Sequence, residues 1–360
     1  MRKIGIVAAV VFVASWIFSL LCMHAAGQAG WKMEEENQNV ISESVAYENN
    51  QKGSEEAAGW NGNSHSADQG DGEAYSRRII LERYGVRTYL SVEDYLPGVM
   101  VCQTGPEMGM EALKCQAVIA RTYIYRQMGE REEIQEEELD LDYLGDDTAQ
   151  AGKTLTVHQK EELAKRLEQC RQAAEATAGV VMKYEDRYIL PLFHERSAGR
   201  TRTGEADYPY LQSVESRWDV EDGGAEIRTA DGDATGGSEV SFSLSEFAQR
   251  IKNLSDAPSL DPEHLSSEIQ IVKRDDAGYV LQIKIGPRTY TGDDVQYALD
   301  LPSTCFTIDT RTSGKIKVTV KGCGHGYGLS QNGAQAMAEE GWSYSDILNY
   351  YYKNISLVTE

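Results

Sequence analysis

The sequence predicts an α+β fold with largely antiparallel sheets and packed helices. Short runs of alternating apolar and polar residues recur from residue 77 to the C-terminus, and two longer segments carry apolar residues at intervals of three and four. Turn and helix-capping residues separate these segments. With 41% hydrophobic residues in a chain of 360, a real core can form, in one large domain or two small ones.

The N-terminus predicts a membrane segment over residues 1–26. Arg2 and Lys3 precede an uncharged apolar run of 20 residues, from Ile4 to Met23. A helix of that length spans about 30 Å, enough to cross a bilayer core, and the basic flank favours an N-in orientation. We therefore expect a single-pass membrane protein with an extracytoplasmic domain. The alternative is a signal peptide, whose cleavage would release a secreted protein.

Residues 27–76 predict a disordered acidic linker. The segment is rich in Glu, Asn, Gln, Ser and Gly, carries clusters such as Glu34-Glu35-Glu36, and shows no helical or strand periodicity. It would act as a tether that gives the domain reach, or as a plain spacer. One folded domain, residues 77–360, is expected to follow.

The first half of that domain predicts strands and two long helices. A hairpin over residues 79–89 would turn at Tyr84-Gly85. A break at residues 96–98 (Leu-Pro-Gly) would precede a helix from Met110 to Met128, and the charged stretch 130–147 would be an exposed excursion.

A second helix, from about Val157 to Ala178, would end at Gly179. A hairpin would follow, with strands Val180–Tyr184 and Tyr188–Phe193. Ser243 with Glu246, and Ser343 with Asp346, would begin short helices in the last part of the chain. The later strands are expected at Ile269–Lys273, Tyr279–Ile285, Cys305–Asp309 and Lys315–Val320.

Charge and cysteine content exclude several classes of function. The formal net charge of −22 argues against a nucleic-acid partner, which requires a basic surface. The six cysteines include no C-x-x-C pair, so a zinc knuckle and a redox motif are excluded, and no cofactor is expected. Cys115 and Cys170 fit buried thiols, although a disulfide through Cys102 or Cys115 stays open.

Three segments place polar residues next to glycines, where a ligand can approach the backbone closely. They are residues 96–123, 193–219 and 322–338. The third reads Gly-Cys-Gly-His-Gly-Tyr-Gly-Leu-Ser-Gln-Asn-Gly-Ala and resembles the G-x-G-H-G-x-G-[ML]-S-Q-x-G-A signature of the stage II sporulation protein D family, which also includes amidase-enhancer proteins. The resemblance covers the chain from about Arg77 to the C-terminus, including the Tyr350-Tyr351-Tyr352 ending.

This resemblance implies a role in the cell wall, in sporulation or in wall remodelling. Enzymes of the family are lytic transglycosylases that act on peptidoglycan glycan strands stripped of their peptides. The family's catalytic glutamate aligns with Gln103 in this chain. An amide cannot protonate the leaving oxygen or act as the base, so the resemblance leaves enzymatic activity open. A glycan-binding module, an active enzyme that uses Glu107, and a structural or enhancing partner of a wall hydrolase or amidase are the three hypotheses.

The remaining candidates are substrate-binding residues. His194, Ser197 and Thr201 match the family's F-H-S-x-S-G-G-x-T stretch, and His325 lies between two glycines. Gln331 has an amide suited to sugar hydroxyls or N-acetyl groups.

Two more candidates carry an equally plain structural interpretation. Ser330 would either cap the next helix or bind the substrate. Arg121 would either pair with an acid in the core or reach the site. Zinc-binding members of the family carry a Cys/His cluster where this chain has the acidic stretch Asp140–Asp147, so we predict no metal.

Overall fold

The structure is a computed structural model that describes residues 77–145, 155–221, 238–252, 254, 260, 265–311 and 314–360. The predicted membrane segment 1–26, the linker 27–76, Cys22, Asp146 and Asp147 lie outside the described residues. Within these ranges, no helix is both long enough and apolar enough to cross a membrane.

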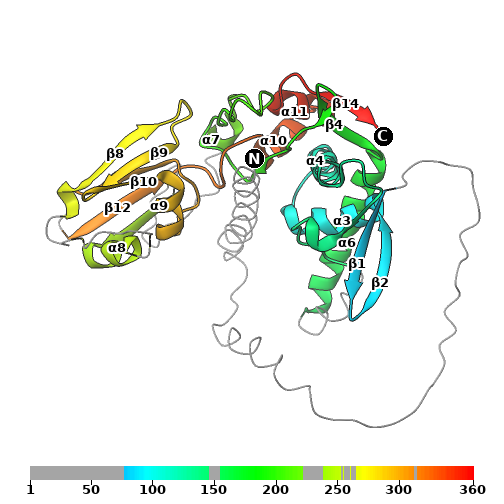
Figure 1. Cartoon of the computed structure of the whole chain (residues 1–360), viewed down its shortest axis with the longest axis horizontal. Coiled ribbons are helices and arrows are strands. Elements are labelled where there is room, and N and C mark those ends of the chain that lie inside the picture. The colour runs from blue at the N-terminus through cyan, green and yellow to red at the C-terminus, as the bar shows by residue number, and fades with distance from the viewer. Residues whose placement is uncertain are drawn as a thin grey trace, which may run out of the picture.

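The described chain forms two lobes, each with its own hydrophobic core (Figure 1). The larger lobe combines the N-terminal half with the C-terminal helices. Its elements are β1 (Arg78–Arg83), β2 (Val86–Ser91), α3 (Val92–Gln103), α4 (Met110–Met128), β3 (Glu133–Gln135), η3 (Glu136–Glu138), α6 (Val157–Ala176), β4 (Val180–Tyr184), β5 (Arg187–Tyr188), β6 (Phe193–His194), α7 (Trp218–Glu221), β13 (Leu329–Ser330), α10 (Gln331–Glu339), α11 (Tyr344–Tyr351) and β14 (Ser356–Thr359).

The smaller lobe is inserted between α7 and β13. Its elements are β7 (Ser238–Ser243), α8 (Leu244–Ile251), η4 (Leu265–Ser267), β8 (Ile269–Arg274), β9 (Val280–Ile285), β10 (Arg288–Thr291), α9 (Gly292–Leu299), β11 (Phe306–Asp309) and β12 (Lys315–Val320). Two three-stranded antiparallel sheets, β10-β9-β8 and β11-β12-β7, share one core with α8 and α9.

The sheets confirm the α+β class. In the larger lobe the strand orders are β2-β1-β3, β14-β4-β5 and β13-β6. Among the described strands, pairing is antiparallel except between β1 and β3 and between β13 and β6. The α3, α4 and α6 helices pack together beside the first of these sheets (Figure 1).

The predicted break at residues 96–98 is wrong, because α3 runs through it to Gln103. Ser91 caps the helix by accepting a hydrogen bond of 3.0 Å from the Asp94 amide. Pro97 has no N–H to donate within the helix, but burial of α3 against α4 and α6 stabilises it. Gly98 is required for packing, since a Cβ there would lie 2.4 Å from a ring carbon of Tyr143.

The two long helices match the prediction closely. The α4 helix spans the predicted residues, and α6 ends two residues early, just before Gly179, whose φ of +70° suits glycine. Cys115 and Cys170 are buried, as predicted, and both of them, like Cys102, are free thiols.

Two local predictions fail for identifiable reasons. The hairpin after β4 is short, because Pro191 interrupts the apolar run, and Phe193–His194 pairs with β13 instead. The stretch after α4 is not wholly an exposed excursion. Glu133–Gln135 adds a strand beside β1, and Ile134 and Leu139 are buried.

A buried arginine joins the two lobes. Arg202 bonds Asp275 of the smaller lobe at 2.6 Å, and its guanidinium lies 5.0 Å from the Tyr279 ring and 4.4 Å from the Tyr327 ring. The Tyr279 hydroxyl also accepts a 3.1 Å hydrogen bond from the Ala198 amide. These contacts fix the smaller lobe against the loop that carries His325.

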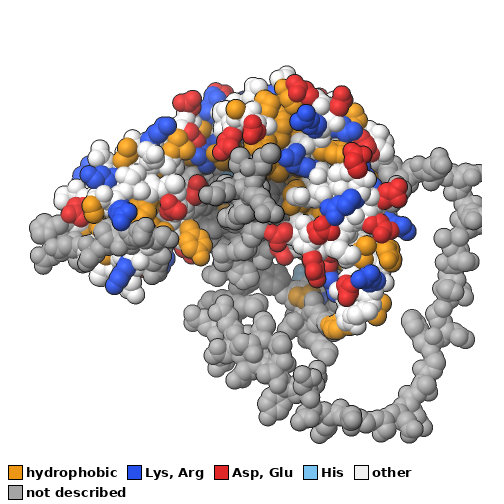
Figure 2. Space-filling view, in the orientation of Figure 1, with side chains coloured by type: hydrophobic (Ala, Val, Ile, Leu, Met, Phe, Trp, Pro, Cys, Tyr) orange, Lys and Arg blue, Asp and Glu red, His pale blue; other side chains and the backbone are white. Residues whose placement is uncertain are grey.

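On the face shown in Figure 2, basic and acidic side chains of the described residues are interspersed.

Candidate functional site

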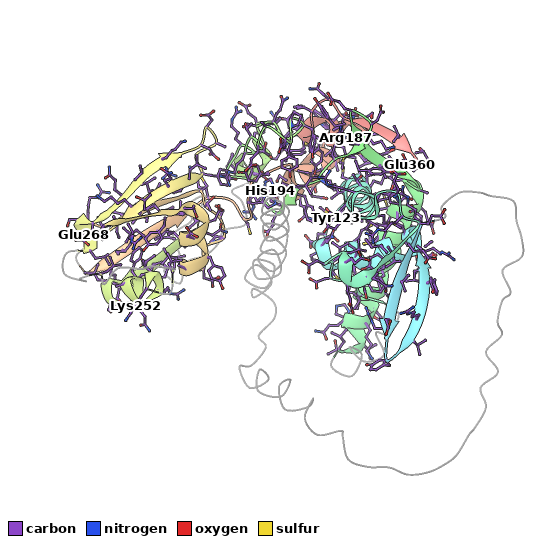
Figure 3. The ribbon with its side chains drawn as sticks, viewed as in Figure 1. Tyr123, Arg187, His194, Lys252, Glu268 and Glu360 are labelled. Atoms are coloured by element: carbon purple, nitrogen blue, oxygen red, sulfur yellow. The ribbon has the colours of Figure 1, made fainter. Side chains whose placement is uncertain are left out.

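The three polar segments meet in the larger lobe. The parallel pair β6–β13 sets His194 opposite Ser330, and Gln331 follows as the first residue of α10. The Gln331 Nε2 atom donates a hydrogen bond of 2.9 Å to the backbone carbonyl of Gln103 at the end of α3. Figure 3 shows His194 on the side of the larger lobe that faces the smaller one. Residues more than 200 positions apart in sequence are thus joined by direct contacts.

Gln103, Gln116 and Gln331 form a chain of side-chain amides, here named the amide cluster. Each is buried, with 1–8% of its surface exposed. A backbone carbonyl can only accept, so Gln331 must direct its Nε2 toward Gln103 O. The same Nε2 donates to Gln116 Oε1 at 3.2 Å, and Gln116 Nε2 then donates to Gln103 Oε1 at 2.5 Å. The carbonyl therefore fixes the orientation of all three amides.

The Gln103 end of the amide cluster has an unused hydrogen-bond donor. Gln103 Oε1 already accepts from Gln116, and Gln103 Nε2 donates to no described residue. Gln103 thus presents an N–H group at this end of the amide cluster. Gln116 was not among the predicted site residues. Its position in the second turn of α4, within the same polar segment as Gln103, could have indicated it.

His194 is fully buried and carries one unused acceptor. Its Nδ1 lies 3.1 Å from the Tyr327 carbonyl, so Nδ1 holds the proton and Nε2 has a lone pair. No described residue hydrogen-bonds this Nε2. Burial lowers the pKa of His194 to about 4, and the ring is therefore neutral at pH 7.

His325 lies beside His194, with 5.7 Å between ring centroids. Its Nδ1 accepts a 2.9 Å hydrogen bond from the Tyr327 amide, and its ring also bonds the Phe193 backbone. Burial, followed by the neighbouring His194 and Arg202, holds the pKa of His325 well below the usual range. The ring thus braces the glycine-rich loop against β6.

Asp219 organises the site and was not predicted. Its carboxylate, 4% exposed, accepts hydrogen bonds at Oδ2 from the Ser197 amide and hydroxyl at 2.9 and 2.5 Å. Its Oδ1 accepts from the Ser330 hydroxyl at 2.8 Å and from Asn332 Nδ2 at 3.2 Å. Ser330 also caps α10 by accepting from the Gly333 amide at 3.1 Å. The position of Asp219 inside the second polar segment could have indicated a role in the site. Its hydrogen-bond partners are distant in sequence, so the role itself could not be read from the residues around it.

The other predicted residues lie apart from this cluster. Glu107 is exposed in the turn after α3. Thr201 accepts a 2.9 Å hydrogen bond from the Val214 amide and so braces a loop. Arg121 is fully buried in the core, where it pairs with Glu93 through two contacts of 2.6 Å. Of the two roles open for Arg121, the structure gives the core ion pair.

Metal ligands do not gather in the described part of the chain. No group of three or more His, Cys, Asp or Glu side chains is arranged there to hold an ion. The two histidines direct Nδ1 atoms at the Tyr327 backbone, which leaves only His194 Nε2 unengaged between them.

Comparison with known proteins assigns the family. A family model described as Stage II sporulation protein matches residues 82–184. Stage II sporulation protein D of Bacillus amyloliquefaciens is 32% identical over 278 residues, which cover 74% of each chain. The chain belongs to the stage II sporulation protein D family.

Two further relatives extend the comparison. Stage II sporulation protein D of Bacillus subtilis (strain 168) is 31% identical over 282 residues, again 74% of each chain. An amidase enhancer of the same organism is 49% identical over 57 residues, which make up 16% of this chain and 8% of the relative. Within the stage II sporulation protein D family, this member combines the amide cluster with the buried histidine pair and Asp219.

Proposed function

We propose that this member of the stage II sporulation protein D family binds peptidoglycan glycan strands outside the cytoplasm and cleaves them little or not at all. The observation that carries the proposal is the donor end of the amide cluster. A lytic transglycosylase needs a carboxylic acid that first protonates the leaving oxygen and then acts as base. Gln103 offers a carboxamide N–H, which does neither.

The same groups suit sugar recognition. The Gln103 Nε2 donor complements the carbonyl of an N-acetyl group. The His194 Nε2 lone pair is fully buried, so it would accept from a sugar hydroxyl only after the loops around it open. A buried polar atom without a partner costs about 1–3 kcal/mol, so a ligand hydroxyl at His194 would recover free energy. Both groups are uncharged near pH 7, as are the N-acetyl and hydroxyl groups of a glycan.

The contacts of Glu107 do not favour the enzymatic alternative. General-acid catalysis requires a carboxyl group held within hydrogen-bond reach of the leaving oxygen. Glu107 is exposed, and it makes no hydrogen bond or ion pair with the rest of the described chain. Its use as an acid would require the 104–109 turn to reorganise around the substrate.

Incubation of the full chain, in detergent micelles, with peptide-free glycan strands tests the proposal. We expect the strands to co-sediment with the protein and mass spectrometry to find no anhydro-sugar products, for the unsubstituted chain and for Glu107→Gln alike. Products that disappear in Glu107→Gln would instead establish the enzyme. Failure to bind any strand would leave a structural role with another envelope protein.

A second candidate function is to assist a wall hydrolase. The likeness to a protein named amidase enhancer favours this role. The measurement is the rate at which a purified cell-wall amidase releases peptides with and without this chain. A rate that rises only when glycan binding is intact would join the two functions.

The proposed setting is the outer face of the membrane, with residues 1–26 as anchor or signal sequence, residues 27–76 as linker and residues 77–360 as the binding domain.

A further inference from the structure

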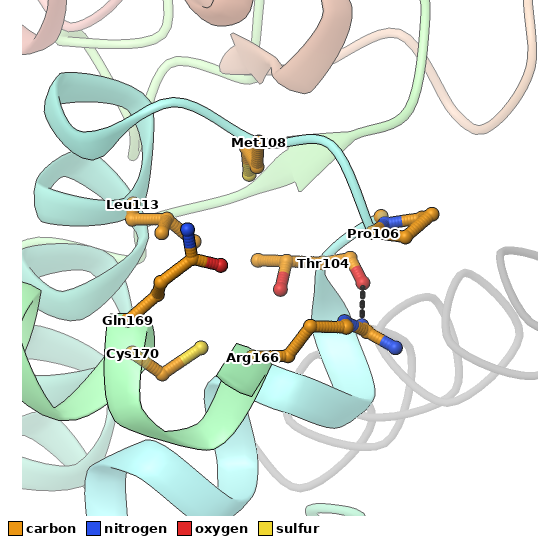
Figure 4. Close-up of a pocket in the computed structure, with 8 residues that line it drawn as sticks. Thr104, Pro106, Met108, Leu113, Arg166, Gln169 and Cys170 are labelled. Carbon is orange, nitrogen blue, oxygen red and sulfur yellow. Dashed lines mark hydrogen bonds between the residues drawn. The ribbon is translucent and has the colours of Figure 1, made fainter. Parts of the chain in front are cut away.

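The recess beneath the turn after α3 is too small to bind a ligand. Arg166 closes one side of it by donating hydrogen bonds to the Thr104 carbonyl at 2.7 Å and to the Val101 carbonyl at 3.0 Å (Figure 4). The space that is left is about 10 Å³, which is room for about one water molecule. A partner at this end of α3 would therefore have to contact the surface of the lobe.

The β1–β2 hairpin gathers exposed apolar side chains on that surface. Tyr84 is 86% exposed, Val86 64% and Tyr89 50%. The β2 strand lies on the outer side of β1 (Figure 1), and no described strand pairs with its other edge. The backbone groups along such an edge can hydrogen-bond to an additional strand.

The β2 strand lacks the features that usually prevent pairing at an edge. Its six residues include no lysine and no proline, and its register with β1 is continuous. Its charged residue, Arg87, already pairs with Glu82 of β1 at 3.2 Å. The edge strand β8 of the smaller lobe has the same length, but it carries Lys273 and two irregularities of register. The free edge of β2 is therefore suited to pairing in a way that the edge of β8 is not.

The geometry of the hairpin identifies the backbone groups on the free edge. The Val92 amide donates to the Arg77 carbonyl at 3.1 Å. Because backbone groups alternate in direction along a strand, the even-numbered residues of β2 direct theirs toward β1. Arg87, Tyr89 and Ser91 therefore direct their N–H and C=O groups to the outer edge.

We propose that β2 pairs with β2 of a second copy of this chain, antiparallel and centred on Thr88. The inference is independent of glycan binding. A two-fold axis normal to the sheet keeps every side chain on its own face, so two residues can lie opposite each other only if the sum of their numbers is even. With Thr88 opposite Thr88, Val86 lies opposite Leu90, and Arg87 lies opposite Tyr89.

Each pair in this register is favourable. Two threonines and two apolar pairs meet on one face, and on the other face the Arg87 guanidinium contacts the Tyr89 ring of the other copy. The outward backbone groups of Arg87 and Tyr89 then hydrogen-bond to each other across the dimer.

The neighbouring registers are worse. Centring the pair on Arg87 places two like charges directly opposite each other, which is destabilising. Centring it on Tyr89 places Val86 opposite Val92, which is fully buried and already belongs to α3. Charge and fold thus select the register centred on Thr88.

Disulfide cross-linking of the full chain in detergent micelles tests both the pairing and its register. One strand per copy is a small contact, so the dimer should be transient, and a covalent link captures it. Thr88→Cys should form a dimer on oxidation with copper phenanthroline, because the two thiols lie opposite each other. Peptide mapping by mass spectrometry identifies the disulfide, and the unsubstituted chain gives the background from the native cysteines.

A pair of variants makes the test specific. Val86→Cys and Leu90→Cys should cross-link when they are mixed, at least about tenfold faster than either variant alone, because pairing makes the reaction effectively intramolecular. Val86→Cys alone is the matched control for chance collision, since Val86 is exposed but does not face itself in the dimer.

A disruptive substitution completes the experiment. Thr88→Lys, added to both members of the mixed pair, should abolish the cross-link, because two ammonium groups would lie opposite each other. Thr88 is exposed, so circular dichroism should show an unchanged fold. The inference is overturned if Val86→Cys alone reacts as fast as the mixture, or if Thr88→Cys reacts no faster than Val86→Cys alone. A mixed cross-link that survives Thr88→Lys also overturns it.

Discussion

Replacement of Asp219 by Ala should destabilise the larger lobe by about 3–5 kcal/mol. The carboxylate is 4% exposed and accepts four hydrogen bonds, from Ser197 (two), Ser330 and Asn332. A hydrogen bond to a charged group contributes about 1.5–3 kcal/mol, and desolvation of the carboxylate offsets part of the sum. Loss of one member of a buried charged network typically costs about 3–5 kcal/mol, because its partners remain buried and unsatisfied.

Two milder substitutions calibrate this prediction. Asp219→Asn can retain an oxygen at the Oδ2 position, where the Ser197 amide must donate, so it should cost only about 1–2 kcal/mol. Ser197→Ala removes one hydroxyl donor and should cost about 1 kcal/mol.

Urea titration followed by tryptophan fluorescence is the appropriate assay, because Trp218 and Trp342 lie in the larger lobe and residues 238–321 contain no tryptophan. The reasoning would be refuted if the free energy of unfolding of Asp219→Ala lay within about 1 kcal/mol of that of the unsubstituted chain. It would also be refuted if Asp219→Ala and Asp219→Asn lost the same amount of stability.

Three further predictions follow from contacts of the fold. Burial lowers the pKa of His194 to about 4, so the unfolded chain binds a proton that the folded chain does not, and stability should fall by up to about 3 kcal/mol as pH drops from 6.5 to 4. His194→Gln should flatten that loss in urea titrations across this pH window, and an unchanged slope would contradict the assignment. Arg121→Met leaves the partly buried Glu93 without its cation and should cost about 3–5 kcal/mol by chemical denaturation, whereas a change below 1 kcal/mol would argue against the ion pair. Gly328→Ala would bring a Cβ within 1.8 Å of a carbonyl oxygen and should lower the yield of folded protein. Gly314→Ala is the control, because Gly314 has a similar φ but open space around it, and it should lower the free energy of unfolding by only about 1 kcal/mol. Equal effects of the two substitutions would contradict the packing.

The sequence predicts those parts of the fold whose signal is local. Apolar spacing predicts α4 and α6 within two residues, and side-chain caps predict the start of α10 at Ser330. The break at residues 96–98 was wrong because Pro and Gly signal a turn locally, whereas α3 is stabilised by two neighbouring helices. Strands such as β3 and β13 are short and pair with distant partners, so their own residues carry little signal.

The site follows the same division. Motifs in the chain single out Gln103, His194, His325 and Gln331 as candidates, and the structure brings their segments together. Protonation and amide orientation depend on contacts across the fold and could not be predicted. The role of Asp219 was hidden for the same reason, since its partners lie 22 and 111 residues away.

Gln103→Glu tests most directly the proposal that the amide of Gln103 keeps this protein from cleaving the glycan strands it binds. Gln116 Nε2, now 2.5 Å from Gln103 Oε1, would hold the new carboxyl group in the same place. Mass spectrometry of peptide-free strands should find anhydro-sugar products with Gln103→Glu, at about 10²–10⁴ times any rate of the unsubstituted chain. Rapid product formation by the unsubstituted chain, left unchanged by Gln103→Glu, would contradict the account.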